Sequence, residues 1–319
     1  MAATTGPGLR EAPVTPGPGP GLATGAGRRV LRTLRGDRGA MLSAAFLVLV
    51  IAMAIAAPLI STLTGSGPNT LNPDAINPNL GGAPLGSLGG ISLAHPFGVE
   101  PDTGRDLLAR TAYGARVSFL IAVSATVLTT TLGVVFGMLA GFFHGWADQA
   151  ISRLMDFLWA FPALIFMIAI LSALPQGNRP LLLVIVLSFF GWPYLGRVIR
   201  GQTLGLTERE FVQAARVSGA KTRQLIFREI MPNLRNTVIV IATLSVPGYV
   251  GTEAALSFLG VGVVAPTPSW GQMISSSLQW YEVDPMFFVV PGGFLFLTVL
   301  SLTVFGDRLR HALDAGEVT

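Results

Sequence analysis

Six apolar stretches, each long enough to cross a bilayer as a helix, constrain this chain more than any other feature. They lie near residues 40–62, 115–143, 149–174, 181–200, 235–262 and 286–306. A helix rises 1.5 Å per residue, so about 20 apolar residues cross a hydrocarbon core of about 30 Å. The chain is therefore expected to be an all-α membrane protein with six transmembrane helices.

Composition supports this expectation. Hydrophobic residues make up 51% of the chain and charged residues only 12%, whereas an average soluble domain has about 25% charged residues. The chain has no cysteine, which excludes disulfides and thiol chemistry. Its net charge of +4 fits arginines at a membrane surface rather than nucleic-acid binding.

The distribution of basic residues predicts the orientation, because short loops rich in Lys and Arg stay on the cytoplasmic side. Six arginines precede the first span, eight basic residues lie between Arg197 and Arg235, and Arg308 and Arg310 follow the sixth span. The loop 263–285 has no Lys or Arg. Both termini are therefore expected in the cytoplasm, with the protein in the cytoplasmic (inner) membrane.

The spans and the segments between them suggest a domain organisation. Residues 1–38, rich in Gly and Pro, are expected to be a disordered cytoplasmic tail, and 39–62 the first, uncleaved transmembrane helix. Residues 63–114 are expected to be an external linker and elbow. The core then covers 115–306, with a charged loop at about 201–234, and 307–319 form a second cytoplasmic tail.

The charged loop between spans four and five carries a helical pattern. Thr207 and Glu210 have the spacing of a capping box that begins a helix, and Gly219 can end it in a left-handed conformation. Residues 211, 214, 215 and 218 fall on one narrow face of that helix, built mostly from small side chains. This face is suited to lying in a groove of another protein.

The same loop resembles a known element. Gln213-Ala214-Ala215, followed by Gly219, Ile230 and Pro232, is similar to the "EAA" loop in the membrane subunits of ABC importers. The family's leading Glu is Gln213 here. In the family this loop is the coupling helix, which sits in a cleft of the ATP-hydrolysing subunit.

The resemblance extends over roughly residues 90–315, to the C-type permease of dipeptide, oligopeptide and nickel importers. The similar segments, in chain order, are His95-Pro96-Phe97-Gly98, Gly104-Arg105-Asp106, Tyr113-Gly114-Ala115-Arg116-Val117-Ser118, Ala160-Phe161-Pro162, Leu256-Ser257-Phe258-Leu259-Gly260, Pro268-Ser269-Trp270-Gly271 and Gly306-Asp307-Arg308-Leu309-Arg310. Each is weak alone, but their order and spacing together are specific.

This resemblance implies a type I ABC importer permease fold with a cytoplasmic coupling helix. It also implies a B-type permease partner, two ATP-binding subunits and an extracytoplasmic peptide-binding protein. The residues expected to couple to the ATPase are Phe211, Gln213, Ala214, Ala215, Ser218, Gly219, Ile230 and Pro232. The expected cargo is short peptides, with nickel chelates, glutathione or another small solute as the alternative.

The chain itself is not expected to be an enzyme. The phosphate-loop pattern Gly-x-x-x-x-Gly-Lys-Ser/Thr is absent and the only lysine is Lys221, so ATP and Mg belong to partner subunits. The three histidines are scattered without metal-ligand spacing. Asp148 and Asp156 are expected to form a charge cluster with Arg153 between them rather than a catalytic pair.

Three glycines in span two, Gly133, Gly137 and Gly141, repeat every four residues, which predicts a close helix–helix contact. Prolines at 162, 193, 247 and 291 predict bends in the spans. A self-contained channel or secondary transporter is disfavoured, because charged residues along several spans and an inverted repeat are lacking.

Two groups of polar residues remain open to two interpretations each. Glu253, with Tyr249 and Ser257 one turn away, either lines the pathway or is a structural acid, because a charge deep in lipid is costly. The segment with Asp102, Arg105 and Asp106 is either an external gate or binding-protein contact, or an elbow whose charges pair with one another.

Overall fold

The computed structural model describes residues 34–175 and 177–314, and its regular structure is almost entirely helical. The helices are α2 (Arg38–Ile55), α3 (Ala57–Thr64), α4 (Leu107–Phe142), α5 (Trp146–Trp159), α6 (Ala163–Ala173), α7 (Arg179–Thr207), α8 (Glu210–Val217), α9 (Thr222–Gln224), the π-helical turn η4 (Leu225–Ile230), α10 (Met231–Phe258), α11 (Trp270–Ser277) and α12 (Met286–Asp314). The segment between α3 and α4 has little regular structure. It contains the 3-10 turns η2 (Pro73–Ala75) and η3 (Pro78–Leu80) and two short antiparallel strands, β1 (Ile76–Asn77) and β2 (Ala83–Pro84).

Among the described residues, five helices are long and apolar enough to cross a membrane. The pair α5 and α6 passes the same test together, although the chain bends by 84° between them. Pro162 lies at this break, where its ring and missing N–H prevent a continuous helix. Counted as one bent span, the pair makes the structure compatible with the six predicted spans.

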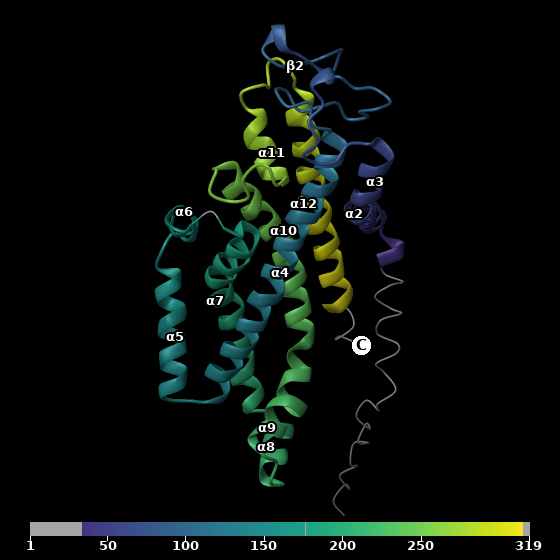
Figure 1. Cartoon of the computed structure of the whole chain (residues 1–319). Helices are drawn as coiled ribbons and strands as arrows, with labels where there is room; N and C mark the ends of the chain where they lie inside the picture. Colours follow the sequence, from purple (N-terminus) through teal and green to yellow (C-terminus); the bar gives the residue numbers. More distant parts are fainter. Residues whose placement is uncertain (1–33, 176, 315–319) are drawn as a thin grey trace, which may run out of the picture.

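Helices α4 and α7 form the central pair of the bundle (Figure 1). A Cβ atom added at Gly137 would lie 2.5 Å from the carbonyl oxygen of Gly196, and one at Gly133 would lie 2.9 Å from Cβ of Leu195. A Cβ atom at Gly141 would lie 2.6 Å from Cβ of Thr203. The close helix–helix contact predicted from the three glycines is confirmed, because any larger side chain at these positions would force α4 and α7 apart.

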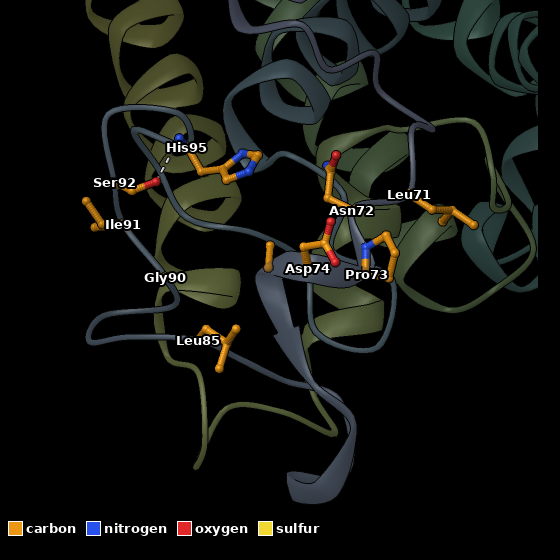
Figure 2. A pocket seen from close by; sticks show the side chains of 10 residues that line it. Leu71, Asn72, Pro73, Asp74, Leu85, Gly90, Ile91, Ser92 and His95 are labelled. Carbon is orange, nitrogen blue, oxygen red and sulfur yellow. Dashed lines mark hydrogen bonds between the residues drawn. The ribbon is translucent and has the colours of Figure 1, made fainter.

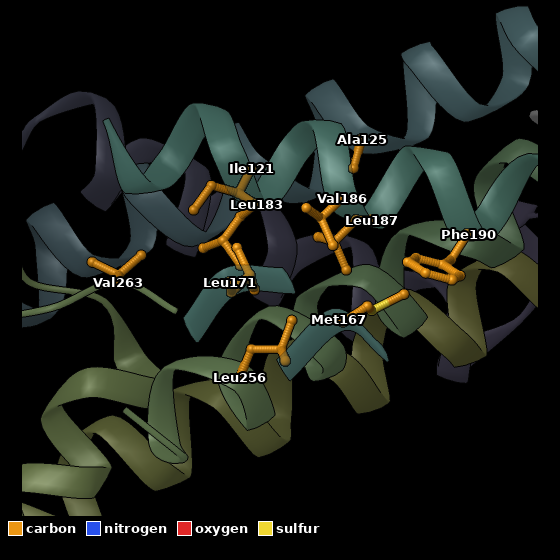
Figure 3. Close-up of a cluster of buried hydrophobic side chains, with 10 residues drawn as sticks. All are labelled: Ile121, Ala125, Met167, Leu171, Leu183, Val186, Leu187, Phe190, Leu256 and Val263. Carbon is orange, nitrogen blue, oxygen red and sulfur yellow. The ribbon is translucent and has the colours of Figure 1, made fainter. Parts of the chain in front are cut away.

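A cluster of buried apolar side chains joins α4, α6, α7 and α10 (Figure 3). Its members come from helices that are far apart in sequence, and α6 contributes two of them after the bend. They are Ile121, Ala125, Met167, Leu171, Leu183, Val186, Leu187, Phe190, Leu256 and Val263. This packing fixes α6 against the bundle despite the break before it.

The two ends of the bundle differ (Figure 1). At one end, residues 66–106 and α11 gather into a cap, which we call the cap end. At the other end, α7 and α10 project beyond α12 and are joined by residues 208–230, which we call the loop end.

The predicted boundaries need three adjustments. Helix α4 begins at Leu107, inside the predicted elbow, and α12 continues to Asp314, so the predicted C-terminal tail is helical in its first part. Residues 34–36 are also helical. The rest of the two predicted tails, 1–33 and 315–319, lies outside the described residues.

Candidate functional site

The loop end is a helical hairpin built from the ends of α7 and α10. After α7 ends at Thr207, α8 begins at Glu210, and α9 and η4 lead directly into α10. Pro232 lies in the first turn of α10, directly after the π-helical turn η4.

The predicted capping box at the start of α8 is wrong. Arg209, not Thr207, is the N-cap residue, and it makes no side-chain cap. Thr207 is instead the last residue of α7, and its hydroxyl donates to the carbonyl oxygen of Leu204 at 2.7 Å. A buried threonine can satisfy its hydroxyl on the preceding turn in this way, and this competes with capping the next helix.

The predicted end of α8 is confirmed. Gly219 has φ of 83°, a left-handed conformation that glycine adopts without steric cost. The N–H of Ala220 donates to the carbonyl oxygen of Ala215 at 3.0 Å, as in a Schellman motif. The turn after α8 therefore follows from the glycine.

One face of α8 is buried and the other is open. Val212 is fully buried in a cluster at the loop end with Leu206, Leu225, Ile230 and Leu234. On the opposite side Phe211 is 42% exposed, and Ala214 and Ser218 are exposed. Ala215 is partly buried against the same cluster as Val212, so three of the four residues of the predicted small-residue face are open to solvent.

Gln213 faces the end of α7. Its side-chain nitrogen Nε2 donates a hydrogen bond of 2.8 Å to the carbonyl oxygen of Thr207. The residue is otherwise exposed. This bond links α8 to the preceding helix across the connecting residues Glu208 and Arg209.

The acids of α5 take part in a charge cluster, as predicted, but their partners are arginines of α7 rather than Arg153. Arg200 donates to both carboxylate oxygens of Asp148, at 2.5 and 2.8 Å. Arg197 donates to Asp156 at 2.7 Å and lies 4.1 Å from the ring centre of Trp159. These contacts join α5 to α7, and they give the two acids a structural role.

Glu253 is fully buried beneath the cap end. The hydroxyl of Ser118 on α4 donates to one carboxyl oxygen at 2.7 Å, and that of Ser257 donates to the other at 2.8 Å. The side chain therefore joins α4 to α10, and of the two interpretations the contacts favour the structural one.

Tyr249 lies one turn before Glu253, and its hydroxyl donates to Thr129 of α4 at 2.9 Å. Ser257 is buried and also accepts the backbone N–H of Val263 at 2.9 Å. The three candidate pathway residues thus make hydrogen bonds within the chain, and two of them, Tyr249 and Glu253, tie α10 to α4.

The three predicted gate or contact residues at the cap end have different environments. Asp106 is fully buried. Its carboxylate caps α4 by accepting from the N–H of Ala109 at 2.7 Å, and its other oxygen lies 2.8 Å from Nδ1 of His95. Arg105 lies 3.7 Å from a carboxyl oxygen of Glu100. Asp102 is exposed, so it is the one whose side chain is open to another molecule.

Arg110 organises the cap end, although the sequence placed it only among the charged residues of the elbow and not among the candidate site residues. Its guanidinium is fully buried and donates to the carbonyl oxygen of Pro68 at 2.9 Å and to Gln272 at 3.1 Å. It also lies 3.4 Å from Glu100. The sequence did contain a signal for this role. Arg110 lies among small side chains at the start of a long apolar helix, and an arginine buried in such a place needs hydrogen-bond or ion-pair partners.

A shallow pocket of about 430 Å³ opens within the cap (Figure 2). Its polar lining comes from Asn72, Asp74, Ser92 and His95, and Leu71, Leu85 and Ile91 supply apolar walls. Asn72 is held by a 2.8 Å bond from Nδ2 to the carbonyl oxygen of Gly104. In the described residues, no group of three or more His, Asp or Glu side chains could hold a metal ion.

Comparison with known families gives two matches. Residues 133–317 match the family described as binding-protein-dependent transport system inner membrane component. Residues 25–80 match the N-terminal transmembrane domain of oligopeptide transport permease C. The two matches together cover most of the chain.

Several curated proteins are similar over nearly their whole length. The oligopeptide transport system permease protein OppC of Bacillus subtilis is 40% identical over 280 residues, which is 88% of this chain and 86% of the relative. The dipeptide transport system permease protein DppC of Alkalihalophilus pseudofirmus is 34% identical over 288 residues, covering 90% and 89%. OppC of Escherichia coli is 34% identical over 278 residues, covering 87% of each chain.

Proposed function

The chain belongs to the family of binding-protein-dependent transport system inner membrane components, and from this premise we propose that it is the C-type permease subunit of an ATP-driven importer of short peptides. The names of its relatives, which are oligopeptide and dipeptide permeases, support peptides as the cargo. The chain itself performs no catalysis in this proposal. ATP and Mg are bound by two ATP-binding subunits, and a B-type permease completes the membrane pathway.

The observation that carries the proposal is the geometry of α8. This short helix stands at the far end of the hairpin, beyond the apolar spans. Phe211, Ala214 and Ser218 are exposed on it, while Val212 and the partly buried Ala215 pack against the support. A small, exposed helical face on a packed support is what docking into a groove requires. It supports the role proposed for Phe211, Ala214, Ala215 and Ser218 in coupling to an ATPase.

At the cap end we propose contact with an extracytoplasmic peptide-binding protein. Asp102 is the exposed member of the three candidate residues, and the buried Asp106 supports the surface by capping α4. Glu253 is assigned a structural role here, because its hydrogen bonds come from serines of this chain.

Isolation of the complex tests this proposal. The chain, tagged and purified from native membranes, should bring with it a second permease and two ATPases. The reconstituted complex, supplied with the binding protein, should hydrolyse ATP faster and accumulate peptide when trialanine is added. Purification without any ATPase would refute the coupling assignment, and stimulation by a nickel chelate or glutathione instead of trialanine would refute the cargo.

Orientation is tested separately in this cysteine-free chain. The loop end carries exposed basic residues, which supports placing it in the cytoplasm with both termini. A cysteine at the exposed Ser87 of the cap should react with a membrane-impermeant thiol reagent in intact cells, and one at the exposed Thr222 of the loop end only after permeabilisation. Labelling of Thr222→Cys in intact cells would reverse the orientation.

A further inference from the structure

Two kinds of contact hold α8 in place, apolar packing and a side-chain hydrogen bond. The helix has eight residues and lacks a side-chain cap at Arg209, so it is too short to be stable alone. Val212 packs into the cluster of apolar residues at the loop end. The second contact is the hydrogen bond from Gln213 Nε2 to the carbonyl oxygen of Thr207 at 2.8 Å.

The position of the acceptor determines which side chain can make this bond. Thr207 ends α7, and the last four carbonyl groups of a helix have no donor within the helix. Partial negative charge also gathers at this end. A side chain that reaches this oxygen must therefore donate a proton, which an amide can do and a carboxylate cannot.

We propose that Gln213 is a positioning residue. Its amide holds α8 to the end of α7, and this contact sets the direction of the exposed face of α8, formed by Phe211, Ala214 and Ser218, which we call the docking face. The importance of that direction for coupling rests on the proposed function, but the hydrogen bond itself does not. Because α7 packs along α4 through Gly133, Gly137 and Gly141, Gln213 joins the short helix to the central pair of the bundle.

Glutamate is the residue at this position in the EAA loop, so Gln213→Glu would bring the sequence closer to that motif. In this structure the substitution removes the donor and places a negative charge beside the carbonyl end of α7. It should therefore weaken the attachment of α8 rather than improve the loop.

The same loop offers a matched control. Gln224 is also exposed, but its side-chain oxygen Oε1 accepts from the backbone N–H of Lys221 at 2.9 Å. Gln224→Glu makes the same change in charge and keeps the acceptor. Gln213→Met completes the set, because it removes the donor at nearly constant size without adding charge.

Two measurements on the purified complex test the idea. Hydrogen–deuterium exchange should show the α8 amides exchanging about two- to ten-fold faster in Gln213→Glu and Gln213→Met, the change expected for loss of one ordinary hydrogen bond. In Gln224→Glu they should exchange as in the parent. Uptake of trialanine per ATP hydrolysed should fall in the same two variants, while the amount of ATPase that co-purifies stays constant.

The exchange data decide the proposal independently of the assigned function. Unchanged exchange of α8 in both Gln213 variants would overturn it, as would equal acceleration in Gln224→Glu, which would point to charge alone. Faster exchange with no change in uptake per ATP would keep the hydrogen bond but overturn its importance for coupling. Absence of an ATPase from the complex would refute the proposed function and leave the exchange result intact.

Discussion

The cap end and the loop end handle charge in opposite ways. At the cap end, Arg110, Asp106 and Glu253 are fully buried and each has partners within the chain. At the loop end, charged side chains are exposed on and around α8. They are Glu208, Arg209, Glu210, Arg216, Lys221, Arg223 and Arg228.

This difference shows how each end depends on other molecules. Burying a charge requires an ion pair or hydrogen bonds, and the cap end supplies them from distant parts of the same chain. Its shape is therefore largely self-contained. The loop end contains one buried apolar cluster and leaves its polar groups in solvent, so its surface is available to a partner. Substitutions should accordingly harm stability at the cap end and coupling at the loop end.

The largest expected effect is at Arg110. Replacing it with methionine removes the donor to Pro68 and Gln272 and leaves the buried Glu100 without its closest cation. Breaking a buried ion pair in this way costs about 3–5 kcal/mol, so the thermal stability and yield of the purified complex should drop sharply.

The matched control is Arg105→Met. Arg105 lies 3.7 Å from the same Glu100, a longer separation than that of Arg110, and its side chain is only partly buried, so its loss should cost less stability than the loss of Arg110. Equal losses in the two variants would show that the cap end does not depend on Arg110 in particular.

Glu253 should show the next largest effect. Glu253→Leu leaves the hydroxyls of Ser118 and Ser257 without their acceptor, and each unsatisfied buried group costs about 1–3 kcal/mol. Glu253→Gln keeps the shape and an acceptor oxygen, so complex yield and trialanine uptake should remain close to the parent values. Normal yield with lost uptake in Glu253→Gln would instead support the pathway interpretation.

At the loop end, Ala214→Trp should separate coupling from stability. Ala214 is exposed, so the larger side chain meets nothing in its own chain and thermal stability should change by less than about 0.5 kcal/mol. Overfilling a docking groove costs about 1–3 kcal/mol, so trialanine-stimulated ATP hydrolysis should fall about ten-fold.

The control for this variant is Gln149→Trp, at an exposed position of α5 outside residues 208–230. It should leave ATP hydrolysis unchanged. Normal coupling in Ala214→Trp would show that the docking face of α8 does not bind the ATPase.

The smallest expected effect concerns Asp284, which lies between α11 and α12. Burial raises the pKa of its carboxyl group, and hydrogen bonds from the N–H groups of Phe287 and Met286 oppose the rise. The folded state therefore holds the proton to higher pH than the unfolded state does, so stability should fall as pH rises from the ordinary carboxyl range through the raised pKa.

Asp284→Asn removes this titration and keeps the oxygen that accepts from the N–H of Met286. Thermal melting across this pH range should then show a shallower dependence than in the parent protein. The same dependence in both proteins would assign the effect to another group.

The sequence by itself determined the features that depend on local spacing. Long apolar stretches predicted the spans, the four-residue repeat at Gly133, Gly137 and Gly141 predicted the α4 packing face, and Gly219 predicted the end of α8. In each case the physical cause acts within a few turns of one helix: hydrophobic length, the absence of a side chain, or freedom at positive φ.

Only the tertiary structure decided the partners of the polar groups. Arg110 binds Pro68 and Gln272, which are 42 and 162 residues away, and Glu253 binds Ser118 at a separation of 135 residues. The sequence misassigned Thr207 and Arg153 for the same reason, since local spacing offered a plausible partner and the folded chain supplied another. A hydrogen bond acts over about 3 Å, and which groups come that close is decided by how the helices pack.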